Sequence, residues 1–332
     1  MYRQAVIQLR HSKNLAFVIM VLSVGINTWF MVPDMFEHDP QPDYYVSILP
    51  YVFSCDIADM PPERYGEPTR NPIKWWLNCA SFTFFENPKV LPMFFNIGVM
   101  PLVYFLGYYL TNDRLIGLIA LQAFLINPLY SDWQTNGTYD QTWSFFLLLS
   151  VVLMLRFKSS GKAWLVYITS IASKSMSILY APLLIITEWV ATKNKRSVIL
   201  FSVLTGLMML YAFTMLGTLV GNSVGFFPEN WEQAVFRNIS LFWQIIPGLL
   251  ALFGINAVFH AKTKPENKKL VILWMVGIFL MTPVIHLFTQ QLTFSYRYVP
   301  FAAFMSVYAG MVLVELGNFV TETRLKIPVK AK

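Results

Sequence analysis

Long apolar segments recur along this chain, and they limit its possible folds more than any other feature. About 20 apolar residues in a helix span the hydrocarbon core of a bilayer. Inside lipid, a helix pairs all of its backbone amides within its own segment. The sequence therefore predicts an all-α integral membrane protein, a polytopic helical bundle of about nine or ten transmembrane segments.

The predicted spans cover residues 14–32, 90–110, 115–130, 142–156, 163–173, 176–191, 198–220, 239–259, 270–288 and 299–318. The fifth and sixth segments are each too short to be an ordinary span, and Lys174 lies between them in a Ser-Lys-Ser sequence. This pattern predicts two half-helices that meet in the outer half of the membrane, where non-helical backbone must line a cavity. No internal repeat is evident, so residues 1–332 are predicted to form a single domain.

The basic residues of the chain are distributed unevenly over the predicted loops. With the N-terminus inside, 18 of the 25 Lys and Arg residues lie on one side of the predicted bundle. By the positive-inside rule this side faces the cytoplasm, together with both termini. The net charge of +7 is therefore assigned to contact with anionic lipid headgroups. Nucleic acid is not predicted as a partner.

The opposite side of the predicted bundle is acidic and holds 13 of the 18 carboxylates, most of them in a long outer loop over residues 33–89. Aromatic residues such as Trp75 and Trp76 predict interfacial helices within this loop. The loop also contains Cys55 and Cys79, and the chain has 2 cysteines in total. On the oxidising side of a membrane these two cysteines are predicted to form a disulfide.

Ionisable residues collect at the outer ends of the predicted spans, and a bundle would bring them to one mouth. They are Asp34, Asp39, Asp43, Asp132, Asp140, Lys174 and Arg297. Such a mouth suits a phosphate-bearing lipid and an acid–base group. Simpler interpretations stay open: Lys174 as a snorkelling side chain, Arg297 as an interfacial anchor and Asp140 as a helix N-cap.

Several segments of the chain, taken in order, resemble the polytopic glycosyltransferases of the GT-C superfamily, which includes dolichyl-phosphate-mannose mannosyltransferases and aminoarabinose transferases. The segments are residues 96–101, 104–120, 127–130, 137–140, 171–177, 180–183 and 295–301. They resemble the second and third spans of the family with the short turn between them, an outer Asp, paired half-helices with a Lys at the break, and a late Arg-Tyr-x-x-Pro element.

The resemblance implies an inverting transferase that takes a sugar from a polyprenyl-phosphate or dolichyl-phosphate donor and passes it to a lipid, glycan or protein acceptor. Asp43, with Asp39 and Asp34 as competing candidates, would be the general base. Lys174, Arg297 and Tyr298 would bind the donor phosphate.

Asp140 and Asp132 would orient the acceptor or hold a divalent metal, and the sequence leaves the need for a metal open. The enzyme would be located in the cell membrane, or in the endoplasmic reticulum of a eukaryote. A non-catalytic subunit of a membrane complex and a secondary transporter remain as alternative functions.

Overall fold

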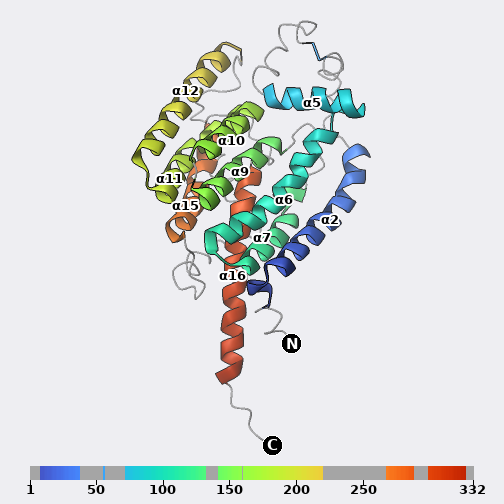
Figure 1. Ribbon diagram of the computed structural model, residues 1–332, viewed down its shortest axis with the longest axis vertical. Helices are drawn as coiled ribbons and strands as arrows, with labels where there is room; N and C mark the ends of the chain where they lie inside the picture. The colour runs from blue at the N-terminus through green and yellow to red at the C-terminus, as the bar shows by residue number, and fades with distance from the viewer. Residues whose placement is uncertain are drawn as a thin grey trace, which may run out of the picture.

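Figure 1 shows the computed structural model of the protein. The structure describes residues 8–37, 55–56, 72–131, 141–158, 160–219, 267–287 and 298–326. In these ranges all regular secondary structure is helical, which confirms the predicted all-α class. Most of the helices lie side by side in a bundle, and α5 (Pro72–Phe85) runs across one end of it (Figure 1).

Most of the remaining elements overlap the predicted segments, but the segment predicted at residues 115–130 is divided into two helices by residues 126 and 127. In chain order, the remaining elements are α2 (Lys13–Glu37), α6 (Val90–Thr111), α7 (Arg114–Leu125), α8 (Pro128–Ser131), α9 (Thr142–Phe157), α10 (Ser160–Ser173), η2 (Ser175–Tyr180), α11 (Ala181–Thr192), α12 (Lys195–Leu219), α15 (Lys268–Leu287) and α16 (Val299–Lys326). The segment predicted at residues 239–259 lies outside the described residues. Helix α2 extends past the predicted boundary at residue 32, through Pro33 to Glu37.

Three helices of the described chain are long and apolar enough to cross a membrane: Lys13–Pro33, Val90–Thr111 and Val299–Val320. The apolar helices Arg114–Leu125, Thr142–Phe157 and Ser177–Thr192 are shorter. At 1.5 Å per residue, the 12 residues of α7 extend only about 18 Å, less than the roughly 30 Å of a hydrocarbon core.

The long helices differ in their position within the bundle. In the apolar window of α16, 83% of residues are buried, against 17% in that of α2. Helix α16 is therefore central and α2 peripheral (Figure 1). The exposed face of α2 carries a continuous apolar stripe of Phe17, Val18, Val21, Leu22, Ile26, Trp29 and Phe30. A stripe of this kind on a peripheral helix suits contact with lipid chains.

Helices α6, α7 and α16 approach each other closely through glycines. A Cβ atom added at Gly117 of α7 would lie 2.7 Å from the carbonyl oxygen of Tyr104 on α6. One added at Gly310 of α16 would lie 2.9 Å from the carbonyl oxygen of Ile116 on α7. Small residues at such contacts let helix backbones pack against each other, as they commonly do in membrane bundles.

We expect Gly117→Ala to destabilise the protein by about 1–3 kcal/mol, because the added methyl group meets backbone that cannot move aside. The thermal unfolding midpoint in detergent measures this loss. Gly25→Ala in α2 is the matched control, since no atom lies within 4 Å of its added Cβ. Equal midpoints for the two variants would contradict the tight α6–α7 contact.

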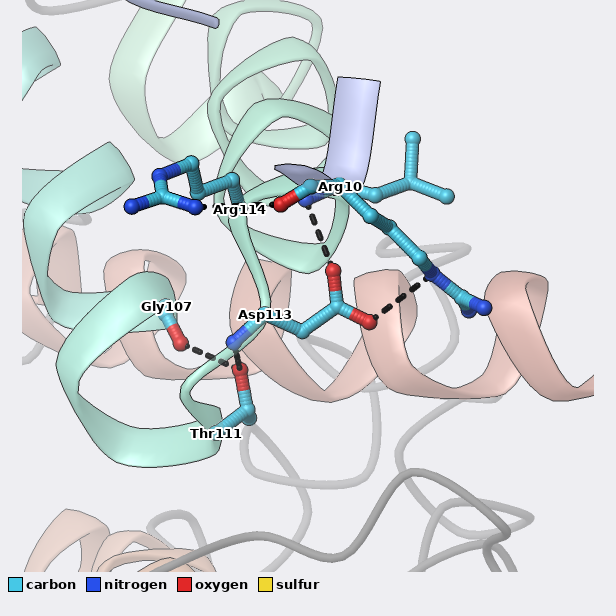
Figure 2. A network of polar contacts seen from close by, with 6 residues as sticks. Arg10, Gly107, Thr111, Asp113 and Arg114 are labelled. Carbon is cyan, nitrogen blue, oxygen red and sulfur yellow. Dashed lines mark hydrogen bonds and ion pairs between the residues drawn. The ribbon is translucent and has the colours of Figure 1, made fainter. Parts of the chain in front are cut away.

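The turn between α6 and α7 is fixed by hydrogen bonds within the chain, as Figure 2 shows. Asn112 ends α6 in the left-handed conformation, and its N–H donates to the carbonyl of Tyr108. The hydroxyl of Thr111 donates to the carbonyl of Gly107 at 2.7 Å and accepts from the N–H of Asp113 at 3.3 Å. Helix α7 can therefore begin directly after α6 ends.

Two arginines connect this turn to the segment that precedes α2 (Figure 2). One carboxylate oxygen of Asp113 accepts from the N–H of Leu115 at 2.9 Å and so caps α7, while the other lies 3.1 Å from Nε of Arg10. Arg114 donates to the carbonyl of Arg10 at 3.1 Å. The Asp113 side chain is only 6% exposed, so this ion pair is well shielded from water.

We expect Asp113→Ala to cost about 1–2 kcal/mol of stability, because it removes an N-cap and the partner of Arg10 together. Asp113→Asn is the matched comparison: asparagine still caps a helix but carries no charge, so its loss should be smaller. Thermal unfolding of both variants measures the difference. An alanine variant as stable as the wild type would show that the cap and the ion pair do not contribute.

Candidate functional site

The chain between α10 and α11 is interrupted at Lys174, as the Ser-Lys-Ser sequence predicts. Lys174 has extended backbone angles, with φ −156° and ψ 115°, between the α-helix α10 and the short 3₁₀ helix η2. Its N–H donates to the carbonyl of Ser170, and its carbonyl accepts from the N–H of Ser177, both at 2.9 Å. The interruption is therefore an ordered break. The side chain of Lys174 is partly exposed.

Hydroxyl groups hold the backbone on both sides of this break. The Oγ atoms of Ser170 and Ser177 lie 2.6 Å apart, and Ser170 also donates to the carbonyl of Trp143 in the first turn of α9. The hydroxyl of Tyr167 donates to the carbonyl of Ser177 at 2.9 Å. Because these groups are buried, they replace water as partners for backbone that leaves the helical pattern.

Local sequence explains why the break forms here. Serine side chains compete with the helical backbone for hydrogen bonds, and Ser173 donates back to the carbonyl of Thr169 at 2.7 Å. Helix α11 then begins with Pro182 in its first turn, where a missing N–H costs nothing. Six residues of 3₁₀ helix between the two α-helices complete the change of direction.

Aromatic rings connect the break to the start of α16. The ring centre of Tyr180, the last residue of η2, lies 6.0 Å from that of Trp143 and 5.3 Å from that of Phe301. The ring of Tyr298 in turn lies 5.8 Å from Phe301. We call the end of the bundle formed by Trp143, Lys174, Tyr180 and Tyr298 the break end.

The break end also contains a buried donor. The indole N–H of Trp143 is buried and meets no acceptor among the residues that the structure describes. The side-chain oxygen of Asn96 on α6 accepts from the N–H of Gln141 at 2.8 Å and so positions the start of α9. The N-cap position of α9 is occupied by Gln141, and Asp140, the residue considered as a cap from the sequence, lies outside the described residues.

Basic residues lie at the opposite end of the bundle. Helix α9 runs for 16 residues, about 24 Å, from the break end to Arg156, whose guanidinium lies 5.9 Å from the ring centre of Tyr109. Arg114 lies 5.1 Å from the ring of the adjacent Tyr108. Asn267, which precedes Lys268 of α15, donates to the carbonyl of Tyr109 at 2.9 Å. We call the end formed by Arg10, Arg114, Arg156 and Lys268 the basic end.

Of the predicted site residues, the structure describes the side chains of Lys174 and Tyr298, and both belong to the break end. The backbone of Asp34 lies in the last turn of α2. Asp39, Asp43, Asp132, Asp140 and Arg297 lie outside the described residues. Along the chain, Arg297 directly precedes Tyr298, and Asp140 directly precedes Gln141.

Sequence analysis missed the buried residues that surround the break: Trp143, Ser170, Ser177 and Tyr180. Their side chains carry no charge, so no rule for ionisable residues in a membrane selects them. The spacing of Ser170, Ser173 and Ser177 around the lysine was the one available signal, because hydroxyls at a helix interruption bond to backbone.

In the part of the chain that the structure describes, no three His, Cys, Asp or Glu side chains gather as ligands of a metal ion would. The residues proposed from the resemblance as alternative metal ligands, Asp132 and Asp140, are not in that part. The described residues of the break end instead offer hydroxyl, indole and ammonium groups. These groups bind an anionic oxygen directly.

Comparison with known proteins finds no relative: no protein-family model, no curated protein and no solved structure matches this chain. The geometry of the break end and the motifs within the sequence are therefore the features of this chain that indicate a function.

Proposed function

We propose that this protein is a multi-pass membrane glycosyltransferase that moves a sugar from a polyprenyl-phosphate donor to an acceptor at the outer membrane face. The observation that carries the proposal is the position of Lys174. It is a cation at an ordered interruption of the bundle, where non-helical backbone is held by buried hydroxyls. Ionisable residues at such breaks are usually functional, because their burial in a bilayer is costly.

The proposed reaction proceeds by one displacement with inversion. A carboxylate at or after the end of α2, Asp43 with Asp39 and Asp34 as alternatives, takes the proton from the acceptor hydroxyl or amide. The acceptor atom attacks the anomeric carbon, and the bond from that carbon to the phosphate oxygen breaks. The polyprenyl phosphate leaves with the electron pair, and Lys174 and Arg297 neutralise its charge.

The two cations would act differently on the leaving phosphate. An arginine grips phosphate oxygens with two parallel hydrogen bonds, whereas a lysine acts as a point charge. Tyr298 follows Arg297 in the chain, and its ring contacts Phe301, which also contacts Tyr180. The indole N–H of Trp143 is a further donor for this charge. Delivery of the sugar on a lipid also removes any need for a nucleotide-binding fold.

We further propose that the basic end faces the cytoplasm, with both termini, and that the break end and α5 face outside. What supports this orientation is the grouping of Arg10, Arg114, Arg156 and Lys268 at one end of the bundle. The first residues of α2 and the last residues of α16 lie at that same end (Figure 1). Lysine and arginine are enriched on the cytoplasmic side of membrane proteins.

The orientation predicts the labelling of single-cysteine variants in intact cells. On a background without Cys55 and Cys79, Thr83→Cys in α5 should react with a membrane-impermeant maleimide, because it lies outside. Lys162→Cys, in the first turn of α10 near the basic end, should react only after the membrane is permeabilised. The reverse pattern would invert the proposed orientation.

The function is tested with purified protein in nanodiscs and a panel of polyprenyl-phosphate sugars. We expect one donor to release polyprenyl phosphate in step with glycosylated acceptor, and Lys174→Met to abolish most of this release. Turnover of a nucleotide sugar in place of every lipid donor would overturn the proposal. Equal release by wild type and Lys174→Met would overturn the proposed role of the break end in donor use.

A further inference from the structure

Arg156 lies in the last turn of α9, where two aromatic rings hold its side chain. Its guanidinium carbon lies 5.9 Å from the ring centre of Tyr109 on α6 and 5.4 Å from that of Phe157, the next residue of α9. A guanidinium group over an aromatic face is attracted by the negative face of the ring. The two rings therefore fix the position of this charge at the basic end.

The charge of Arg156 lacks a counter-ion in the part of the chain that the structure describes. Arg156 forms no ion pair and no side-chain hydrogen bond with another described residue, and it is exposed. Its N–H groups are donors in a fixed fork, which matches the oxygens of a carboxylate or a phosphate. An anion from outside the described chain can therefore bind to Arg156 without displacing a protein partner.

The length of α9 sets the depth of Arg156 in a bilayer. The helix has 16 residues and extends about 24 Å, which is less than the roughly 30 Å of a hydrocarbon core. The last turn of so short a helix lies close to the level at which lipid phosphates meet the acyl chains. A cation without a partner is costly at that depth, and a lipid phosphate is the anion within reach.

A second cation reaches the same place from another helix. The side-chain amide of Asn267 donates to the carbonyl of Tyr109 at 2.9 Å, and α15 begins at the next residue, Lys268. Helices α6, α9 and α15 therefore meet at Tyr109, and α9 and α15 each bring a basic residue. Two positive charges beside one half-buried ring suit an anionic headgroup.

An apolar side chain beside the charge distinguishes a lipid from a free anion. Phe157 is 59% exposed, although its ring lies next to the guanidinium of Arg156. A free phosphate ion would gain nothing from this ring. A phospholipid carries acyl chains next to its phosphate, so it can cover the ring and neutralise the charge at the same time.

We propose that Arg156, Tyr109 and Phe157 form a binding site for one anionic phospholipid. The lipid phosphate accepts hydrogen bonds from the Arg156 guanidinium, Lys268 adds a second positive charge, and an acyl chain lies against the ring of Phe157. General attraction to a charged membrane surface would involve every exposed cation of the basic end alike, whereas this site depends on one arginine. The inference requires a protein embedded in a membrane, but neither the proposed orientation nor glycosyl transfer.

The test measures lipid binding to the full-length protein in a non-ionic detergent by native mass spectrometry. Phosphatidylglycerol and phosphatidylcholine with the same acyl chains are added in separate titrations. We expect one phosphatidylglycerol to bind about 10-fold more tightly than phosphatidylcholine, because the choline cation opposes the two basic residues. Equal binding of the two lipids would overturn the proposal. Displacement of phosphatidylglycerol by an equal concentration of inorganic phosphate would show an anion site without acyl contact, and would also overturn it.

Two matched variants separate this site from general attraction. Arg156→Gln and Lys158→Gln each remove one exposed positive charge from the end of α9. We expect Arg156→Gln to weaken phosphatidylglycerol binding by about 10-fold, the usual effect of losing a hydrogen bond between charged groups. Lys158→Gln should leave it unchanged, and equal losses in the two variants would contradict the site. The lipid preference of the wild-type protein decides the main point even if a variant folds poorly.

Discussion

If the proposed function holds, we expect replacement of Lys174 with methionine to lower kcat/KM for the polyprenyl-phosphate donor by about 10²-fold, the usual effect of removing one group that stabilises developing negative charge. Methionine keeps most of the length and apolar character of the lysine stem but cannot neutralise a phosphate. The backbone hydrogen bonds of residue 174 to Ser170 and Ser177 do not involve the side chain, so the break itself should survive. Initial rates over a series of donor concentrations measure the change.

Two further variants make this result specific to the charge at the break end. Lys174→Arg keeps a cation and should recover part of the activity. Lys162→Met removes a lysine from the other end of the same helix and should leave the rates unchanged. If Lys174→Met matched the wild type with an unchanged thermal midpoint, Lys174 would be a snorkelling side chain with no role in donor use.

We expect replacement of the proposed base Asp43 with asparagine to reduce turnover by about 10²-fold or more, because the amide keeps the shape of the carboxylate but cannot take up the acceptor proton. Donor binding should persist, since the phosphate contacts are assigned to other residues. Single-turnover rates together with donor affinity separate the two effects.

Asp39→Asn and Asp34→Asn are the matched controls for this experiment, because both lie in the same stretch of chain. A large loss in one of these variants, with full activity in Asp43→Asn, would move the role of base to that residue. Full activity in all three variants would exclude a base at or after the end of α2. The non-catalytic subunit would then become the better hypothesis.

The break at Lys174 is the part of the candidate site that neighbouring residues in the sequence predict. Two short apolar segments and the serine–lysine–serine run between them predict the interruption, because both signals act on backbone within a few residues. The tertiary contacts around the break were not predictable in this way. Ser170 and Trp143 are 27 residues apart in the sequence, so no periodic pattern of neighbouring residues indicates their contact.

The aromatic contact between Tyr180 and Phe301 is still more remote in sequence. It depends on α16 occupying the centre of the bundle, which in turn depends on the close glycine contacts of α6, α7 and α16. The position of Tyr298 beside the break end is therefore a result of packing. The Arg-Tyr element of the sequence indicates the chemical character of Tyr298 but not its position.

The sequence by itself determined the helical class and the approximate positions of most helices that the structure describes. Apolar length and local hydrogen bonding specify a helix, and these properties belong to contiguous residues. Only the tertiary structure decided which parts of the chain meet: Asp113 with Arg10, and the break with the start of α16. The physical reason is that such pairs are selected by the fit of whole helix faces, which forms only when the bundle assembles.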